Sequence, residues 1–353
     1  MEHFVSIIMP AYNAESRIEK TVHSLERQSY QDFELIIVND GSSDKTGQLC
    51  DSLAKQYTNI KVLHEQNAGP SKAREKGICI AEGDLIAFVD SDDFLSDNAL
   101  KVLTGKMDES DADIIQFGYK MVSDSGRVIS EHLSKACSVE NAKTGKEVYG
   151  FFIAQKDCTD VLWDKIFKHS LFCDIDWPES YYNEECVVLA QLYGRAKKVV
   201  TIEDQFYYYV QHSESVTHEP FTQKMLDLFP SCNCVIQYTR NNYPEFLPEA
   251  LFYLAARAAV FCGRAKDSNL NNKDDIYNSI LQTFKCTYAE MMQILKQQGR
   301  TLELNKMTKV FAFSPRLVLW LRKAYLEISK CKDRTIKIDE NFLAMQRAAN
   351  RCN

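Results

Sequence analysis

The chain has 353 residues, which is the length of one large domain or two ordinary domains. Its net charge of −7 argues against nucleic acid as a partner, because proteins that bind nucleic acid carry a basic surface. The twelve cysteines lack the spacing of a zinc site or a disulfide framework, and the start MEHFVSIIMPAYN does not resemble a secretion signal. We therefore expect reduced cysteines in a cytoplasmic protein, and no apolar run reaches the ~20 residues that span a membrane.

The first hundred residues alternate between apolar strands and amphipathic helices. The predicted strands cover residues 5–10, 33–40, 60–65 and 85–90, and the predicted helices between them cover residues 16–29, 46–57 and 69–83. The strands are mostly apolar rather than alternating, which is typical of strands buried on both faces. The pattern predicts an α/β fold in which a parallel sheet has helices on both faces.

The elements after residue 104 follow a less regular pattern. They are a strand at 112–122, its pairing partner at 126–133, and helices at 161–172 and within 181–199. From about residue 222 the pattern is mostly helical, and prolines stand near the breaks between helices. The sequence therefore divides into an α/β part, residues 1–217, and a mostly α-helical C-terminal region, residues 218–353.

Polar residues collect where the predicted strands end. The four ends read Pro10-Ala11-Tyr12-Asn13, Asn39-Asp40-Gly41-Ser42, Glu65-Gln66-Asn67-Ala68-Gly69 and Asp90-Ser91-Asp92-Asp93. One such end is explained by a turn and a helix cap, but four at the same edge of a sheet favour a binding site. Ligands of parallel α/β sheets bind at the carboxyl ends of the strands.

The three aspartates after the fourth strand predict a divalent cation. Like charges repel, so a positive group is expected to meet them at the end of this buried strand. Mg²⁺ and Mn²⁺ bind carboxylate oxygens together with diphosphate oxygens. Neither G-x-x-x-x-G-K-[ST] nor G-x-G-x-x-G occurs, so the metal rather than a glycine loop is expected to hold phosphates. The predicted ligand is a nucleoside diphosphate joined to another group, with Asp40 facing its ribose or its base.

These residues resemble the family 2 glycosyltransferases of the GT-A fold, of the type that makes bacterial surface polysaccharides. The matching stretches run from VSIIMPAYN to NDGSSDKT, from NAGPSKAREKG to LIAFVDSDD, and over NEE and YYYVQHSESVT. The resemblance implies a GT-A-like nucleotide-binding domain over 1–217, with a donor half at 1–105 and an acceptor half at 106–217. It also implies a nucleotide-diphosphate sugar as donor, with uridine as the default nucleoside.

The resemblance assigns roles at the strand ends. The residues implied to bind the nucleotide sugar are Pro10, Ala11, Tyr12, Asn13, Asp40, Asn67, Arg74, Asp90, Ser91 and Asp92. Within this set Asp90-Ser91-Asp92 is the D-x-D motif. Asp92 is the implied metal ligand, while Asp90 faces the ribose or a water beside the metal and is the second candidate ligand. Arg74 is expected near the base or the phosphates.

A Glu-Asp pair often supplies the catalytic base in this family, and the matching pair here is Glu184-Glu185. We expect Glu185 to be the base, with Glu184 as second choice. His212 lies where the family has a lid over the donor phosphates. The residues grouped on the acceptor side are Trp163, Lys165 and His212.

The implied reaction is a direct displacement that inverts the anomeric carbon. One carboxylate takes the proton of an acceptor hydroxyl, and the metal stabilises the departing diphosphate. The expected acceptor is a glycan or a lipid-linked glycan. Two other functions stay open: a non-catalytic protein that binds nucleotide sugars or acts as a scaffold, and a nucleotidyltransferase. The latter normally has a glycine-rich basic loop after its first strand, and PAYNAES has neither feature.

Residues 315–332 combine apolar and basic side chains at helical spacing. A basic amphipathic helix binds anionic membrane surfaces, although packing against its own domain is an equally simple explanation. The sequence therefore leaves open a peripheral contact with the inner face of the plasma membrane.

Overall fold

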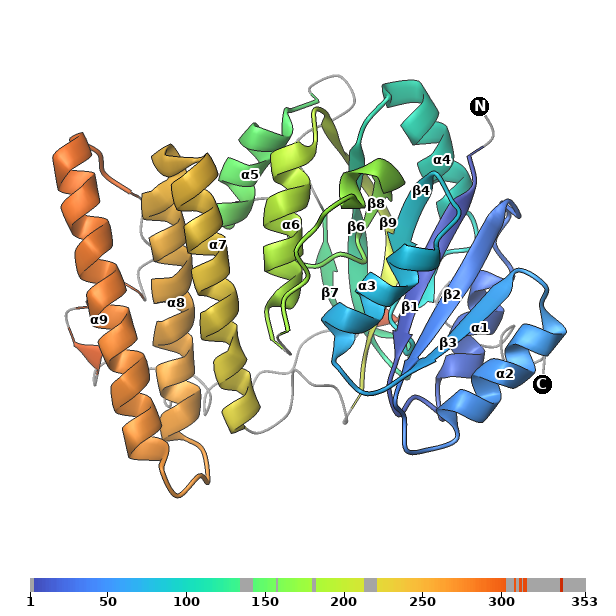
Figure 1. Ribbon diagram of the computed structural model, residues 1–353, viewed down its shortest axis with the longest axis horizontal. Coiled ribbons are helices and arrows are strands. Elements are labelled where there is room, and N and C mark those ends of the chain that lie inside the picture. Colours follow the sequence, from blue (N-terminus) through green and yellow to red (C-terminus); the bar gives the residue numbers. More distant parts are fainter. Residues whose placement is uncertain are drawn as a thin grey trace. The chain divides into compact units, whose positions relative to one another are not determined.

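The structure is a computed structural model of the whole chain (Figure 1). It describes residues 3–133, 142–156, 158–179, 182–212, 221–302, 308, 311–312, 314–315 and 337–338. The chain forms two compact units. The first comprises Met1–Tyr149, Asp157–Ser213 and Ile336–Asn353, and the second comprises Gly150–Lys156 and Glu214–Thr335.

The first unit is built on four parallel strands in the order β3-β2-β1-β4. These are β1 (Val5–Ala11), β2 (Phe33–Asp40), β3 (Ile60–Glu65) and β4 (Leu85–Phe88). Every residue of β2 and β4 is buried, as the unbroken apolar runs predict. The parallel register brings the carboxyl ends of the strands to one edge of the sheet.

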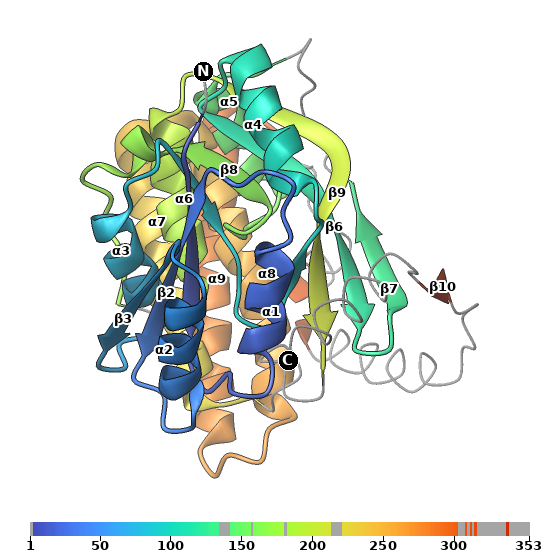
Figure 2. The ribbon, with the colours of Figure 1, turned by 90° about the vertical axis from the view of Figure 1, so that its right-hand side faces the viewer.

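Helices cover both faces of these strands, as predicted. They are α1 (Ile18–Leu25), α2 (Thr46–Gln56) and α3 (Pro70–Ile80). Figure 2 shows α1 and α2 on one side of the strands and α3 on the other. The arrangement follows from right-handed crossovers, since the chain reverses direction across the sheet after β3. Gly77 lets α3 approach closely, because a Cβ there would lie 2.5 Å from the Ile8 side chain on β1.

Further strands extend the sheet beyond β4. They are β5 (Phe94–Leu95), β6 (Ile114–Ser123), β7 (Arg127–His132), β8 (Lys165–Lys168), β9 (Val199–Gln211) and β10 (Lys337–Ile338). Within the described residues the main order is β10-β7-β6-β8-β4-β1-β2-β3, with β9 paired to β5 and β6. The predicted pairing of 126–133 with the strand before it is confirmed by β6 and β7. The helices of this part are α4 (Ala99–Ser110), α5 (Gly145–Ile153) and α6 (Glu184–Arg195).

The predicted helix at 161–172 is wrong. Residues Lys165–Lys168 form strand β8, followed by the 3₁₀ helix η2 (His169–Phe172). Strand β8 lies between β4 and β6, and Ile166 and Phe167 are fully buried there. A short apolar run does not distinguish a buried strand from a buried helix, so only the pairing with distant strands decides the structure.

The second unit is mostly α-helical, as predicted for the C-terminal region. Its elements are η4 (Gln223–Asp227), α7 (Leu228–Asn242), η5 (Pro244–Phe246), α8 (Leu247–Lys266) and α9 (Lys273–Gln298). Helix α8 packs against both α7 and α9 (Figure 1). The segment Pro244–Lys266 is long and apolar enough to cross a membrane, and 78% of its apolar window is buried inside the protein. The basic amphipathic segment 315–332 falls almost entirely outside the described residues.

Candidate active site

The ends of β1 and β2 are tied to each other by Asn13. Its backbone adopts φ 50°, and its side-chain oxygen accepts a hydrogen bond from the Ser43 N–H at 2.9 Å. The Asn13 N–H donates to the Ser42 hydroxyl at 3.0 Å. Ala11 is buried beside this turn, whereas 54% of Tyr12 is exposed. The edge of the sheet therefore presents an aromatic ring to solvent where the nucleotide base is predicted.

Asp40, at the end of β2, holds the loop that follows β3. Its two carboxylate oxygens accept hydrogen bonds from the N–H groups of Ala68 and Gly69, at 2.8 and 2.9 Å. The Asn67 side chain donates to the Asp40 carbonyl at 3.0 Å. Gly41 has φ +67°, and a Cβ on it would lie 2.6 Å from the Asn67 nitrogen, so this close approach requires glycine. Asp40 and Asn67, which are predicted to bind the nucleotide sugar, thus hold the loop after β3 against the end of β2 in this structure.

Arg74 lies at the centre of a buried cluster of charges. Its guanidinium donates to Asp90 at 3.1 Å and to Glu184 at 3.2 Å, and it pairs with Glu185 at 2.8 Å. Helix α3 supplies Arg74, the end of β4 supplies Asp90, and the first turn of α6 supplies both glutamates. Sequence reasoning placed Arg74 beside the base or the phosphates. The structure joins it to the predicted catalytic pair, with Glu184 110 residues away in the chain, and its nearness to the base or the phosphates stays a prediction.

One guanidinium faces three carboxylates in this cluster, so the negative charge is not fully compensated. Burial raises the pKa of Asp90 and Glu184, although Arg74 opposes the change. Burial likewise raises the pKa of Glu185 to about 8, against the attraction of Arg74 and a 2.8 Å hydrogen bond from the Leu162 N–H. A carboxyl group with this pKa exchanges a proton near neutral pH, as a general base must.

Asp92 contacts His212 rather than Arg74. The His212 Nε2 lies 2.8 Å from the Asp92 Oδ2, and His212 is nearly buried at the end of β9. Ser91, between the two aspartates, has its carbonyl bonded by the Thr21 hydroxyl of α1 at 3.0 Å. The structure therefore places His212 at the D-x-D motif, away from Lys165, with which it was grouped on the acceptor side.

Asp92 and His212 together offer a carboxylate oxygen and an imidazole nitrogen, which contact each other in this structure at 2.8 Å. Two ligands at right angles around an octahedral ion at ~2.1 Å would lie about 3.0 Å apart, so a small movement of the pair would admit a divalent cation. No cluster of three or more histidine, cysteine, aspartate or glutamate side chains suited to a metal occurs in the described part of the chain. Mg²⁺ commonly binds through one or two carboxylates together with substrate phosphates and water, and the Asp92 carboxylate fits that mode.

Asp93 and Tyr207 join the acidic tip to β9. The sequence analysis grouped Asp93 with Asp90 and Asp92 as the three aspartates expected to meet a cation, and it gave Tyr207 no role in the site. The Asp93 carboxylate accepts hydrogen bonds from the Tyr207 hydroxyl and from the Val210 N–H, both at 2.8 Å. The same hydroxyl accepts a hydrogen bond from the Asp90 N–H at 3.1 Å. The signal in the sequence was the position of Asp93 directly after the D-x-D motif. In the structure Asp93 is fully buried and therefore unable to meet a ligand in solvent.

Trp163 belongs to an aromatic stack behind the site. Its ring lies 4.3 Å from the Tyr207 ring and 5.6 Å from the Tyr209 ring, nearly parallel to both. Only 6% of Trp163 is exposed. The residue before it, Leu162, donates its N–H to Glu185. Trp163 therefore supports the segment that holds the predicted base.

Lys165, predicted on the acceptor side, is fully buried and does not face a cleft. Its ammonium donates to Asp164 and to the Val161 carbonyl at 2.6 Å, and to the Thr159 hydroxyl at 2.7 Å. All three ammonium hydrogens thus have acceptors within one short loop. Lys165 fixes the shape of the segment that leads to Trp163.

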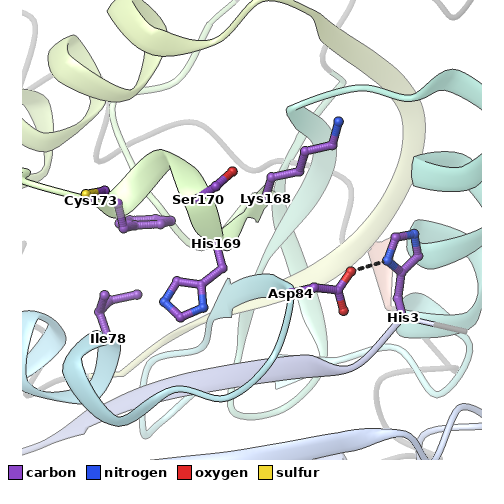
Figure 3. A pocket seen from close by; sticks show the side chains of 8 residues that line it. His3, Ile78, Asp84, Lys168, His169, Ser170 and Cys173 are labelled. Atoms are coloured by element: carbon purple, nitrogen blue, oxygen red, sulfur yellow. Dashed lines mark hydrogen bonds and ion pairs between the residues drawn. The ribbon is translucent and has the colours of Figure 1, made fainter.

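A cavity of about 580 Å³ lies at the opposite end of the strands (Figure 3). It is lined by His3, Ile78, Asp84, Lys168, His169, Ser170, Phe172 and Cys173. His3 and Asp84, which are bonded to each other, stand just before β1 and β4. No residue that the sequence predicts for the site lines this cavity.

Sequence comparison finds glycosyltransferases. Residues 6–173 match the family model for glycosyl transferase family 2. The chain is 31% identical over 231 residues to the uncharacterized glycosyltransferase EpsJ of Bacillus subtilis, covering 63% of this chain and 65% of EpsJ. It is 28% identical over 214 residues to the poly(ribitol-phosphate) beta-N-acetylglucosaminyltransferase TarS of Staphylococcus aureus, covering 59% of this chain and 36% of TarS.

The comparison of folds agrees. The structure of residues 1–349 of Staphylococcus aureus TarS in complex with UDP superposes with a TM-score of 0.66 at 21% sequence identity. The alignment covers 96% of this chain and 97% of that one. The same TarS segment in complex with UDP-GlcNAc gives a TM-score of 0.65. The chain therefore has the GT-A-like fold of the TarS segment, and its residues 6–173 match the model of the family 2 glycosyltransferases.

Proposed function

We propose that the protein transfers a sugar from a nucleotide-diphosphate sugar, with uridine as the nucleoside, to a hydroxyl group of a glycan or lipid-linked glycan. The transfer inverts the anomeric carbon, uses Mg²⁺ or Mn²⁺, and serves the synthesis of a surface polysaccharide at the cytoplasmic face of the membrane. The match of residues 6–173 to the family 2 glycosyltransferase model supports the reaction class. TarS, solved with UDP and UDP-GlcNAc, supports the donor class.

A second relative supports the acceptor class. The Campylobacter jejuni protein named GalNAc(5)-diNAcBac-PP-undecaprenol beta-1,3-glucosyltransferase is 29% identical over 191 residues, covering 54% of this chain and 59% of that protein. Its name describes an oligosaccharide on a lipid carrier. The proposal of a lipid-linked glycan for the present chain rests on this likeness and on the basic segment 315–332.

The observation that carries the proposal is the cluster around Arg74. Through one guanidinium it connects Glu185, a carboxyl group with a pKa near 8, to Asp90 of the D-x-D motif. A direct displacement needs the proton acceptor and the donor sugar side by side, because orientation of the reacting groups supplies much of the rate. The cluster joins the predicted base and the D-x-D motif in one buried network, which supports the proposal.

The chain's own residues account for the steps of the reaction. Tyr12 offers a ring to the base, and the Asp40 loop shapes the pocket around it. Arg74 and the Leu162 N–H hold the Glu185 carboxylate, which takes the proton of the acceptor hydroxyl as the new glycosidic bond forms. Asp92 and His212 would hold the metal, which supplies positive charge to the leaving diphosphate.

The test is a thermal-shift and turnover experiment on the full chain. We expect UDP with MnCl₂ to raise the melting temperature, because a ligand at 100 times its Kd stabilises the native state by about 2.7 kcal/mol. EDTA and Asp92→Asn should abolish the shift, and the exposed control Asp32→Asn should keep it. A panel of UDP-sugars then identifies the donor by UDP release.

Two outcomes contradict the proposal in different ways. No shift with any nucleoside diphosphate would reject the donor site as assigned. Binding of UDP-sugars without turnover on any glycan or lipid-linked glycan acceptor would support the non-catalytic binding protein instead.

A further inference from the structure

Asp93 and Tyr207 form a buried hydrogen-bonded unit directly behind the D-x-D motif. Both side chains are fully buried. The Tyr207 hydroxyl donates to the Asp93 Oδ2 at 2.8 Å and accepts from the Asp90 N–H at 3.1 Å. The Asp93 Oδ1 accepts from the Val210 N–H at 2.8 Å. One phenol and one carboxylate thus connect the end of β4 with the end of β9, more than 110 residues apart in the chain.

Packing alone does not require these polar groups. Burial, together with the charges of Asp90 and Asp92, raises the pKa of Asp93 well above its usual value. The surrounding core is apolar, with Phe94, Val122, Tyr208 and Val210 in one cluster. An apolar pair of similar shape would fill such a core without desolvating a carboxyl group. A polar unit at this position is therefore expected to fix a geometry.

The geometry in question is that of Asp92 and His212. Asp92 is the residue before Asp93, and His212 is the second residue after Val210. The bonds of the Asp93 carboxylate therefore restrain the backbone next to both side chains, whose Oδ2 and Nε2 atoms lie 2.8 Å apart. The pairing of Leu95 on β5 with Tyr207 on β9 also joins these two segments of the chain.

The Tyr207 ring extends this support toward the predicted base. It stacks on Trp163 with ring centroids 4.3 Å apart. The neighbouring Leu162 donates its N–H to Glu185 at 2.8 Å. Tyr207 thus supports both parts of the site. Its hydroxyl contacts the segment of the D-x-D motif, and its ring packs on the segment that bonds to the glutamate pair of α6.

We propose that the Tyr207 hydroxyl and the Asp93 carboxylate are positioning groups for the donor's divalent cation, because they hold Asp92 and His212 at the spacing of metal ligands. The inference rests on the proposed function, which supplies the metal and the diphosphate. Tyr207 contacts neither ligand of the metal through its own side chain and is therefore not itself a catalytic residue. Removing the partners that orient metal ligands weakens metal affinity by about 10–100-fold in other proteins.

The test measures Mn²⁺ affinity of the full chain by electron paramagnetic resonance, with saturating UDP. Tyr207→Phe keeps the ring on Trp163 and removes only the hydroxyl. Tyr193→Phe is the matched control, since it removes another fully buried hydroxyl, bonded to Gln116 at 3.4 Å. We expect Tyr207→Phe to raise the Kd for Mn²⁺ about tenfold or more and to broaden the bound-metal spectrum. Tyr193→Phe should leave both unchanged.

Separate results overturn the inference and the proposed function. Wild-type protein that binds no Mn²⁺ with UDP would reject the metal site of the proposed function, and the inference with it. Normal Mn²⁺ binding by wild type and by Tyr207→Phe would reject the inference alone. If Tyr207→Phe does not fold, Asp93→Asn is measured instead, with the same tenfold expectation. Uridine has no phosphate and should therefore bind all folded variants equally. Loss of uridine binding in a variant would show that the whole nucleotide site, and not only the metal site, has been disrupted.

Discussion

Two buried clusters of charge in the first unit differ in how far their charges are compensated. Lys165 meets one carboxylate, Asp164, and all three of its ammonium hydrogens have acceptors within one loop. Arg74 meets three carboxylates, and its Nε has no hydrogen-bond partner in the described structure. The fully paired ammonium of Lys165 fixes the shape of its loop. In the Arg74 cluster the carboxylates outnumber the cation, so one carboxyl group can exchange a proton and the cluster can still bind a ligand.

For this reason we propose that the chemistry takes place at Arg74.

The largest expected effect tests the incomplete cluster. Glu185→Gln removes the proton acceptor but keeps the size of the side chain and an oxygen for the Leu162 N–H. We expect kcat to fall by about 10²–10⁴-fold, the usual contribution of general base catalysis, while the Kd for the UDP-sugar stays near that of wild type. Glu184→Gln, one position earlier, should cost less. A larger loss in Glu184→Gln than in Glu185→Gln would exchange their roles.

The completed pair should respond in stability rather than in catalysis. Lys165→Met leaves the fully buried Asp164 without its cation, which typically costs about 3–5 kcal/mol of unfolding free energy. Urea denaturation measures this loss. The double variant Lys165→Met with Asp164→Leu should recover most of it, because replacing a whole buried pair with apolar residues is often nearly neutral. Equal destabilisation of the single and the double variant would show that the charge itself is not the cause.

Changing the pH should reveal the proton that the incomplete cluster binds, with Glu185→Gln as the reference protein. The pKa of Glu185 is about 8 in the folded protein and near its usual 4.5 in the unfolded chain, so the folded state binds the extra proton. This contribution to stability is complete below pH 4.5 and is lost as the pH rises through about 8. Between pH 6 and pH 9 we expect wild type to lose on the order of 2 kcal/mol relative to Glu185→Gln.

Melting curves of both proteins at the two pH values provide the measurement. At about 2–4 °C per kcal/mol, the gap between wild type and Glu185→Gln should open by several degrees. Parallel pH profiles of the two proteins would show that Glu185 is ionised throughout and that Arg74 compensates it fully.

The fold of the donor half could be predicted from the sequence because its signals are local. Apolar runs marked β1 to β4, and the polar residues that follow them marked the edge where Asp40 and Asp90 lie. The resemblance to a family selected Glu184 and Glu185, and the roles of all these residues in the reaction stay predictions. Strand β8 was missed because its identity depends on β4 and β6 rather than on its own sequence.

Three contacts that assemble the site could not be predicted, because each of them joins residues more than a hundred positions apart. Arg74 to Glu184 spans 110 residues, Asp93 to Tyr207 spans 114, and Asp92 to His212 spans 120. No periodicity or spacing in a single sequence encodes such pairs. Lys165 illustrates the same limit, since the resemblance suggested that it lies on the acceptor side, whereas its side chain is fully buried and bonded within one loop.

The smallest expected effect comes from a charge pair outside both clusters. Arg240 and Glu290, in the second unit, lie 2.9 Å apart, and about two fifths of each side chain is exposed. Water already solvates both groups, so the pair should contribute less than about 1 kcal/mol. Arg240→Gln should therefore change the unfolding free energy by no more than that in urea denaturation, and 0.5 M NaCl should remove what difference there is, because salt screens exposed charges. If Arg240→Gln lowered the unfolding free energy as much as Lys165→Met does, burial would not be what determines how much a charge contributes to the stability of this protein.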